Sequence, residues 1–255
     1  MASPIILVLA TRNAGKTAEI RALLKDFPIE IRNLDDFGPI PEIEEDGTTF
    51  DENAYKKAHF AARVLGFPAL ADDSGLVVEA LDGAPGVYSA RYAGENASDA
   101  ERSAKLLQAM AGKANRAAAF ECVISIAVPE GPALTYEARC EGQITDQPIG
   151  GNGFGYDPIF FYPPLNKTFA QMTMAEKSGV SHRGKALYEL RSEFDKALLI
   201  LPDQHTPVLT RELIYTGITR AKKSIEVWGT ERIFIEGVRQ RIERSSGLRD
   251  ALWEV

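Results

Sequence analysis

The feature that most constrains the fold is a short apolar run that changes abruptly into a polar, glycine-containing segment. Residues 5–10 are all apolar, and Thr11–Lys16 follows at once. A continuous rather than alternating apolar run is typical of a strand buried on both faces of a sheet. Helical spacing then places Ile20, Leu23 and Leu24 on one face of residues 19–24. The chain therefore begins with a strand–turn–helix unit, as α/β proteins do.

The hydrophobic pattern of the next 190 residues predicts more strands and helices in alternation. Strands are expected at 68–71, 77–81, 117–128 and 134–144, and helices at 49–65, 98–110, from 174 onward and at 185–198. Ser98 and Glu101 have the spacing of a capping box, and 129–132 resembles a hairpin turn. We predict a two-lobed mixed α/β fold around a partly antiparallel central sheet, with a cleft between the lobes.

Composition narrows the class of protein. The net charge of −7 argues against general nucleic-acid affinity and suits small-molecule chemistry. No run approaches the roughly 20 apolar residues of a membrane span, and no charged segment with a cleavage site precedes the first strand, so a cytoplasmic protein is expected. Two cysteines, Cys122 and Cys140, are too few for a disulfide framework and are predicted to be reduced.

The turn at Thr11–Lys16 is a candidate phosphate site. It lies where a buried strand leads into a helix, so free backbone N–H groups and the helix dipole favour an anion there. Lys16 adds a mobile positive charge. Residues 10–17 also fit a relaxed P-loop pattern, ending in Gly15-Lys16-Thr17, although Ala10 stands where the strict form has glycine. Phosphate binding is predicted either way, and an ATPase remains an alternative.

Two acidic clusters are candidates for metal binding. Glu42, Glu44, Glu45 and Asp46 are predicted to lie in a loop, and Asp72-Asp73 are predicted to end a buried strand. Carboxylates beside a phosphate site are natural Mg²⁺ ligands, because Mg²⁺ prefers hard oxygen donors and retains waters. Such a carboxylate could also deprotonate the water that attacks phosphorus.

A glycine-rich segment and a cationic segment suggest recognition of a base. Residues 150–157 place Phe154 and Tyr156 among four glycines, and either aromatic ring could stack on a nucleobase. Residues 176–184 concentrate hydrogen-bond donors. A purine with O6 in place of an amino group needs donors opposite it, and Lys177, His182 and Arg183 would supply them and would penalise adenine.

Five segments together resemble the inosine/xanthosine triphosphate pyrophosphatase family, in the family's order and spacing, over roughly residues 5–198. They are LATRNAGK (9–16), EEDGTTFDENA (44–54), ADDSGLVVEALDGAPGVYSARYAG (71–94), GGNGFGYDPIFF (150–161) and EKSGVSHRGKAL (176–187). The resemblance implies Mg²⁺-dependent cleavage of dITP, ITP or XTP between the α- and β-phosphates, which gives the monophosphate and pyrophosphate. It also implies a two-lobed α/β fold and a homodimer.

The resemblance also implies roles for individual residues. Asp73 would be the general base and a metal ligand, and Glu44, or Glu45 in its place, would be a second acidic ligand. The remaining residues would bind the substrate. The residues that would bind the triphosphate are Thr11, Arg12, Asn13, Ala14, Gly15 and Lys16. Ser74 would contact the substrate. The residues that would hold the base and sugar are Phe154, Gly155, Tyr156, Asp157, Lys177, His182 and Arg183.

The remaining residues, 199–255, have a different character. From Pro202 onward the chain has 9 basic and 8 acidic residues, whereas the rest carries a net charge of −8. Residues 210–223 (TRELIYTGITRAKK) resemble helicase motif VI at the end of the RecD subunit of exonuclease V. We predict two domains, a pyrophosphatase over 1–198 and a helicase-like remnant over 199–255 that docks loosely or is poorly ordered.

Three classes of function follow. The pyrophosphatase is preferred. The first alternative is an ATPase or helicase fragment, which the length and order of the motifs disfavour. The second is a catalytically inert protein that binds nucleic acid through its tail, where Arg220, Lys222 and Lys223 supply positive charge. The tail's net charge of +1 makes the last a weak candidate.

Overall fold

The structure of this protein is a computed structural model that describes residues 5–27, 29–41, 43, 45–129, 131, 133–194, 196–200 and 224–240. The chain divides into two compact units, Met1–Glu189 and Leu190–Val255. Among the described residues, no helix combines the length and the apolar character that crossing a membrane requires.

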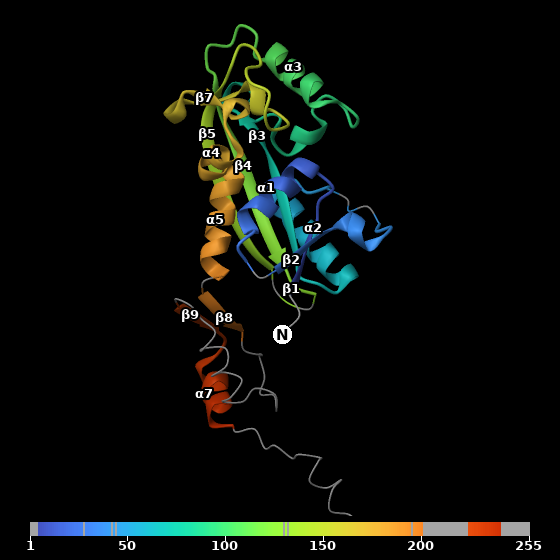
Figure 1. Cartoon of the computed structure of the whole chain (residues 1–255), viewed down its shortest axis with the longest axis vertical. Coiled ribbons are helices and arrows are strands. Elements are labelled where there is room, and N and C mark those ends of the chain that lie inside the picture. The colour runs from blue at the N-terminus through green and yellow to red at the C-terminus, as the bar shows by residue number, and fades with distance from the viewer. Residues whose placement is uncertain are drawn as a thin grey trace, which may run out of the picture. The chain divides into compact units, whose positions relative to one another are not determined.

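The first unit is built on a seven-stranded mixed sheet (Figure 1). β1 pairs in parallel with the strands on both sides of it, and all the later pairings are antiparallel. In spatial order the strands are β2 (Ile29–Asn33), β1 (Ile5–Leu9), β3 (Ala69–Val78), β4 (Ala117–Ala127), β5 (Ala133–Ile144), β6 (Phe160–Tyr162) and β7 (Lys167–Thr168). This sheet confirms the predicted mixed α/β fold, including the hairpin between β4 and β5.

Five helices accompany the sheet: α1 (Ala14–Leu24), α2 (Phe50–Leu65), α3 (Asp99–Ala109), α4 (Met174–Val180) and α5 (His182–Phe194). α2 packs on β3 and β4 through a face of small residues, Ala54, Ala58, Ala61 and Ala62, which are fully buried. α3 has the predicted capping box, in which Ser98 accepts a hydrogen bond from the Glu101 amide and Glu101 accepts one from the Ser98 amide.

The predicted end of a strand at Asp72-Asp73 is wrong, because β3 is one continuous strand of ten residues. It pairs with β4 from Ala69, opposite Ala127, to Val78, opposite Ala118. The polar residues stay in the strand because the ladder satisfies their backbone groups. Asp72–Gly75 also separates two apolar clusters, one that includes Ala71 and one that includes Leu76. A polar site between the two halves of the core is the result.

The helix predicted at 185–198 begins earlier, at His182, and ends earlier, at Phe194. The residues after it form β8 (Lys196–Ile200), which pairs in parallel with β9 (Ser224–Trp228) in a separate two-stranded sheet. α7 (Glu231–Arg239) follows β9. Residues Ala197–Leu199 are apolar enough for a helix or for a strand. Their pairing with β9, a distant segment, explains why they form a strand instead of the predicted end of the helix.

Several predictions about the second unit concern residues outside the described ranges. The helicase-like segment 210–223, with Arg220, Lys222 and Lys223, lies wholly outside them. The domain boundary at 198 and the helicase resemblance therefore stay predictions. The two cysteines lie within the described part of the chain. Cys122 in β4 and Cys140 in β5 are both free, as predicted, and both are buried.

Candidate active site

A cavity of about 420 Å³ in the first unit gathers most of the predicted site residues. They come from the end of β1, the start of α1, the middle of β3, the glycine-rich loop before β6, and α4 and α5. Those that line it are Thr11, Arg12, Asn13, Lys16, Glu45, Asp73, Ser74, Phe154, Gly155, Tyr156, Asp157, Lys177, His182 and Arg183. Glu44 lies outside the described residues, and Ala14 and Gly15 are not among the lining residues.

The start of α1 gives the cavity a set of oriented backbone amides. Asn13 is the N-cap, and its Oδ1 accepts a hydrogen bond of 3.0 Å from the Lys16 amide. Thr11 Oγ1 accepts one of 3.1 Å from the Asn13 amide. Gly15 leaves room for an aromatic ring, since a Cβ there would lie 2.5 Å from Cδ1 of Phe154. The first turn of α1 therefore lies at the cavity, where its backbone amides and the helix dipole favour an anion.

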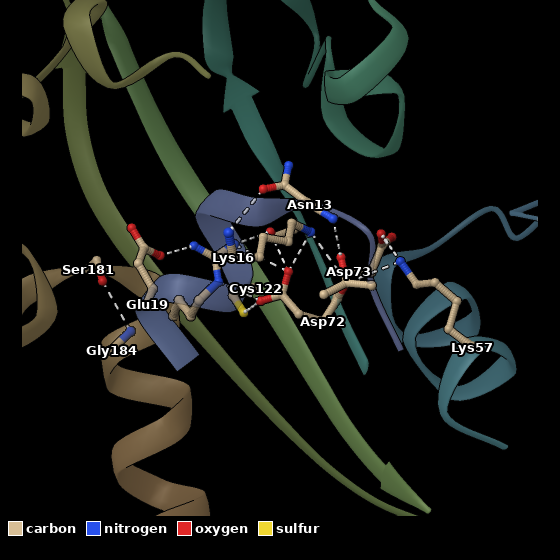
Figure 2. Close-up of polar contacts among 12 residues, drawn as sticks. Asn13, Lys16, Glu19, Lys57, Asp72, Asp73, Cys122, Ser181 and Gly184 are labelled. Atoms are coloured by element: carbon tan, nitrogen blue, oxygen red, sulfur yellow. Dashed lines mark hydrogen bonds and ion pairs between the residues drawn. The ribbon is translucent and has the colours of Figure 1, made fainter. Parts of the chain in front are cut away.

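Asp72 is the most deeply buried charge of the site, and Figure 2 shows the polar contacts that surround it. Its carboxylate lies 2.5 Å from Nζ of Lys16 and 2.8 Å from Nε of Arg183, and it accepts hydrogen bonds from Ser74 Oγ and Cys122 Sγ. Burial opposes its ionisation, but Arg183 and Lys16 outweigh that effect and hold its pKa well below the usual range. Asp72 is therefore an ionised anchor whose oxygens are already engaged, which argues against the metal-ligand role that its sequence position suggested.

Asp73 has the opposite character. One oxygen, Oδ1, accepts a hydrogen bond of 2.8 Å from Nζ of Lys57, but the other, Oδ2, is buried and has no hydrogen-bond partner among the described residues. Burial raises the pKa of Asp73, although Lys57 and Lys16 oppose this effect. A buried oxygen with an unused lone pair, beside an anion-binding helix, can accept a proton or bind a cation.

Lys57 connects Asp73 to the acidic loop. Its Nζ lies 3.4 Å from Oε1 of Glu45, and it donates to the carbonyl of Asp72 at 3.1 Å. Burial disfavours its charge, but Asp73 and Glu45 more than compensate and raise its pKa, so Lys57 stays protonated. The ammonium thus holds two carboxylates of the cavity at one point.

The residues present fit a magnesium ion in part. No three His, Cys, Asp or Glu side chains of the described segments gather in a way that could hold a metal. However, Mg²⁺ in nucleotide sites is commonly held by one or two carboxylates together with waters and phosphate oxygens. Asp73, with its unpartnered Oδ2, and Glu45, whose side chain is 41% exposed, supply such a pair.

A second buried charge cluster lies beside the first, and sequence reasoning missed its centre, Glu19. Its carboxylate is 2.7 Å from Nζ of Lys177 and forms a close ion pair with Arg183. Lys177 also lies 2.6 Å from Oδ2 of Asp157. Although burial opposes the charge of Glu19, Arg183 and Lys177 lower its pKa. The cluster connects α1, the glycine-rich loop, α4 and α5, and it engages much of the donor capacity of Lys177 and Arg183.

The two candidate stacking residues, Phe154 and Tyr156, have different surroundings in the structure. Phe154 lies on the cavity wall, with Nζ of Lys177 4.8 Å and the guanidinium carbon of Arg183 5.7 Å from its ring centre. Tyr156 is only 4% exposed, and its hydroxyl donates to the carbonyl of Ser89 at 2.9 Å. Tyr156 is therefore part of the core, and Phe154 is the better candidate for a stacking platform.

His182 is almost fully buried and stacks on Phe120, with ring centres 4.7 Å apart. Burial and the nearby charge of Arg183 hold its pKa well below the usual range, so the ring is neutral. Its Nδ1 has no hydrogen-bond partner among the described residues. A neutral ring that lines the cavity with an unused nitrogen can exchange a hydrogen bond with a ligand.

Sequence reasoning missed Lys57, Glu19 and Phe120, and the signals for them were unequal. Lys57 occupies the alanine face of α2, between Ala54 and Ala61, where a lysine is out of place unless it is paired. Glu19 lies next to the apolar Ile20, but helical spacing alone allows it to face solvent. Phe120 resembles an ordinary core residue, and only its place beside His182 reveals its contact with the site.

The buried cluster generates a prediction about stability. Glu19→Gln removes one carboxylate from two cations, so we expect the free energy of unfolding at pH 7 to fall by about 3 kcal/mol. The lowered pKa in the folded state means that the carboxylate stabilises the fold above its ordinary pKa of 4.5. The difference between variant and parent should therefore shrink as the pH falls below 4.5. Urea unfolding over a pH series measures both effects.

Glu121→Gln is the matched control, because it removes the partner of Arg139 on the partly exposed surface. Its expected cost is about 0.5 kcal/mol. Equal effects of the two substitutions, or a Glu19→Gln effect that grows in acid, would contradict the proposed stabilisation.

Comparisons with known proteins show the family to which the chain belongs. A family model described as the Ham1 family matches residues 7–193. A protein of Syntrophobacter fumaroxidans named dITP/XTP pyrophosphatase is 65% identical over 193 residues, which cover 76% of this chain and 83% of that protein. A protein of the same name from Desulfotalea psychrophila is 61% identical over 188 residues, 74% of this chain and 84% of that one.

Solved structures show the same fold. A HAM1 protein from Coxiella burnetii has a TM-score of 0.69 and 46% identity and covers 74% of this chain and 98% of its own. The Ham1 protein of Staphylococcus aureus has a TM-score of 0.68 and 41% identity, with the same coverage. On the match over residues 7–193 and on these relatives, the chain belongs to the Ham1 family.

Proposed function

We propose that this chain is a Mg²⁺-dependent nucleoside triphosphate pyrophosphatase that hydrolyses the noncanonical purine nucleotides dITP, ITP and XTP to the monophosphate and pyrophosphate and so cleanses the nucleotide pool. The observation that carries the proposal is the buried Oδ2 of Asp73, which has no hydrogen-bond partner in the described ranges and lies in the same cavity as the start of α1. The names of relatives that are 65% and 61% identical support the same activity.

The phosphates of the substrate would lie at the start of α1. Backbone amides of Asn13, Ala14, Gly15 and Lys16 lie in or next to its first turn, where a helix favours anions. Lys16 now contacts Asp72, at 2.5 Å, and its mobile side chain can turn to a phosphate oxygen. Thr11, Arg12 and Ser74 line the same cavity and add polar contacts.

Asp73 would be the general base. A water molecule held by its Oδ2 loses a proton to the carboxylate as its oxygen forms a bond to the α-phosphorus. The bond from that phosphorus to the oxygen that bridges to the β-phosphate breaks, and pyrophosphate leaves with the electron pair. Lys57, bonded to Oδ1, fixes the orientation of the carboxylate during this step.

Asp73 and Glu45 would hold Mg²⁺, and Glu44, which lies outside the described residues, stays the other proposed acidic ligand. When bound, the ion would neutralise charge on the phosphate oxygens of the substrate. The same two carboxylates now share Lys57, so a positive charge is already accommodated at this point of the cavity.

Selection of the base would fall to the other end of the cavity. Phe154 offers a ring for stacking, and Gly155 and Asp157 shape the loop that carries it. The ammonium of Lys177 and the guanidinium of Arg183 lie next to that ring. The Nδ1 of His182 has no hydrogen-bond partner within the described part of the chain. Donors at this place would favour a purine with O6 over adenine, whose 6-amino group is itself a donor.

The alternatives have less support. The relaxed P-loop pattern at 10–17 falls inside the stretch 7–193 that matches the Ham1 family, so it does not require an ATPase or helicase. For residues 199–255 we propose an appended helicase-like remnant without a role in the reaction, and nucleic-acid binding by it is not favoured. From the family resemblance we also propose a homodimer, and from the two free cysteines we propose a cytoplasmic location.

A substrate panel tests the proposed function directly. Purified protein with Mg²⁺ should release pyrophosphate from dITP, ITP and XTP, and far less from ATP, because donors at the base site disfavour the 6-amino group of adenine. The panel also includes dGTP, whose base carries O6 as well. The products are identified by ion-exchange chromatography, and a sample with a chelator is the control. Release of orthophosphate from ATP, stimulated by DNA, would instead support the motor protein.

Asp73→Asn tests the proposed base. The amide keeps the size of the side chain but cannot take up the proton, so we expect kcat for dITP to fall by at least ~10²-fold. Asp82→Asn is the matched control, because Asp82 lies in an exposed turn with a left-handed backbone that asparagine also adopts. Unchanged turnover in the Asp73 variant, with Asp82→Asn also normal, would refute the assignment.

Truncation after Leu198 tests the proposed division of the chain. The shortened protein retains the whole stretch 7–193 that matches the family. We therefore expect it to keep the kcat/KM of the full chain for dITP. A truncated protein with native circular dichroism but no turnover would show that the extension takes part in the reaction.

A further inference from the structure

The glycine-rich loop that carries Phe154 is held from two sides at consecutive amides. On the inner side, Oδ2 of Asp157 accepts a hydrogen bond of 2.9 Å from the Phe154 amide. On the outer side, Oδ2 of Asp99 accepts one of 2.7 Å from the Gly155 amide. Gly155 has a φ of +63°, a left-handed conformation in which glycine is favoured. Its amide therefore depends on a carboxylate from a different element, the first turn of α3.

Asp99 is itself firmly placed. Its other oxygen, Oδ1, forms a close ion pair with Arg102, one turn further along α3. Arg102 donates to the carbonyl of Ala90 at 3.0 Å and to that of Ala97. These contacts tie the first turn of α3 to the segment before it. The carboxylate of Asp99 is thus a fixed acceptor for the loop.

Capping of α3 does not require the Asp99 side chain. Ser98 and Glu101 form the capping box, with hydrogen bonds of 3.2 and 2.7 Å between side chains and amides. Asp99 and Arg102 instead line the cavity of the active site. Two acidic residues in one helical turn therefore have different tasks, since Glu101 caps the helix and Asp99 holds the loop.

We propose that Asp99 is a positioning residue for the purine base, because it holds the Gly155 amide and thereby keeps Phe154 on the cavity wall between two fixed points. The Phe154 carbonyl also accepts a hydrogen bond of 3.3 Å from the Asp157 amide. Gly153 and Gly155 on either side of Phe154 both adopt a left-handed φ, so the side of the loop at Gly155 depends on the contact with Asp99. The inference rests on the proposed function, in which Phe154 stacks on the base of the substrate.

The role predicts a specific kinetic pattern in Asp99→Ala. Stacking forms in the ground state and persists in the transition state, so its loss should raise KM for dITP by about fivefold and leave kcat unchanged. Asp99→Asn keeps an oxygen that can accept from Gly155 but loses the ion pair with Arg102, and it should give a smaller rise. The inhibition constant of pyrophosphate should not change, because pyrophosphate does not contact the base site.

Glu101→Ala is the matched control on the same turn of α3. It should lower the melting temperature through loss of the cap but leave KM for dITP as in the parent. A double variant provides the decisive comparison. In a Phe154→Leu background, Asp99→Ala should raise KM little further, because both changes remove the same stacking contact.

Amide hydrogen exchange supplies a measurement that does not depend on activity. The Gly155 amide should exchange faster in Asp99→Ala than in the parent, while the amides of α3 beyond its first turn keep their protection. An active parent whose KM is unchanged by Asp99→Ala, or additive effects of Asp99→Ala and Phe154→Leu on KM, would overturn the inference. A parent that hydrolyses none of the nucleotides would overturn the proposed function instead.

Discussion

The buried carboxylate of Asp72 places a full negative charge in the middle of a central strand, and the architecture of the site depends on how that charge is neutralised. The two cations that do so, Lys16 and Arg183, come from α1 and α5, which are separated by more than half of the chain. An uncompensated charge at this position would cost several kcal/mol. The start of α1 and the start of α5 are therefore held against β3, and the anion-binding turn and the base-recognition segment lie on one cavity.

The charges around the cavity are balanced before any substrate binds. The buried cations are Lys57, Lys177 and Arg183, with Lys16 at the edge, and the buried carboxylates are those of Glu19, Asp72, Asp73 and Asp157. A nucleoside triphosphate adds several negative charges to this balance, so its binding requires a further cation or a change of partners. Lys16, the most exposed of the four cations, and a magnesium ion at Asp73 and Glu45 meet that requirement in the proposed reaction.

The two aspartates of β3 show how local surroundings separate identical side chains. Asp72 has cations and donors on both oxygens and a lowered pKa, whereas Asp73 has one engaged oxygen, one unpartnered oxygen and a raised pKa. Successive residues of a strand point to opposite faces of the sheet. One aspartate therefore meets Lys16 and Arg183, and the other meets Lys57 on α2. A structural anchor and a candidate base thus lie next to each other in the sequence.

The sequence by itself determined the elements whose signals are local. The apolar run at 5–10, the capping box at Ser98 and Glu101, and the hairpin of β4 and β5 follow from neighbouring residues, and all of them are found. Most of the site residues that motif order identified do line the cavity. Local signals failed where long-range contacts determine the structure. β3 continues through Asp72 and Asp73 because it pairs with β4. α5 ends before β8 because β8 pairs with β9.

Only the tertiary structure decided which charges meet. Glu19 and Lys177 are 158 residues apart in the chain, and no helical or strand spacing relates them, yet they form a buried ion pair. The separation of Tyr156, a core residue, from Phe154, a residue of the cavity wall, has the same origin, because it depends on the carbonyl of Ser89 and on the space above Gly15. Periodicity specifies which face of an element is buried, but the partner that compensates a buried charge is chosen by packing between elements.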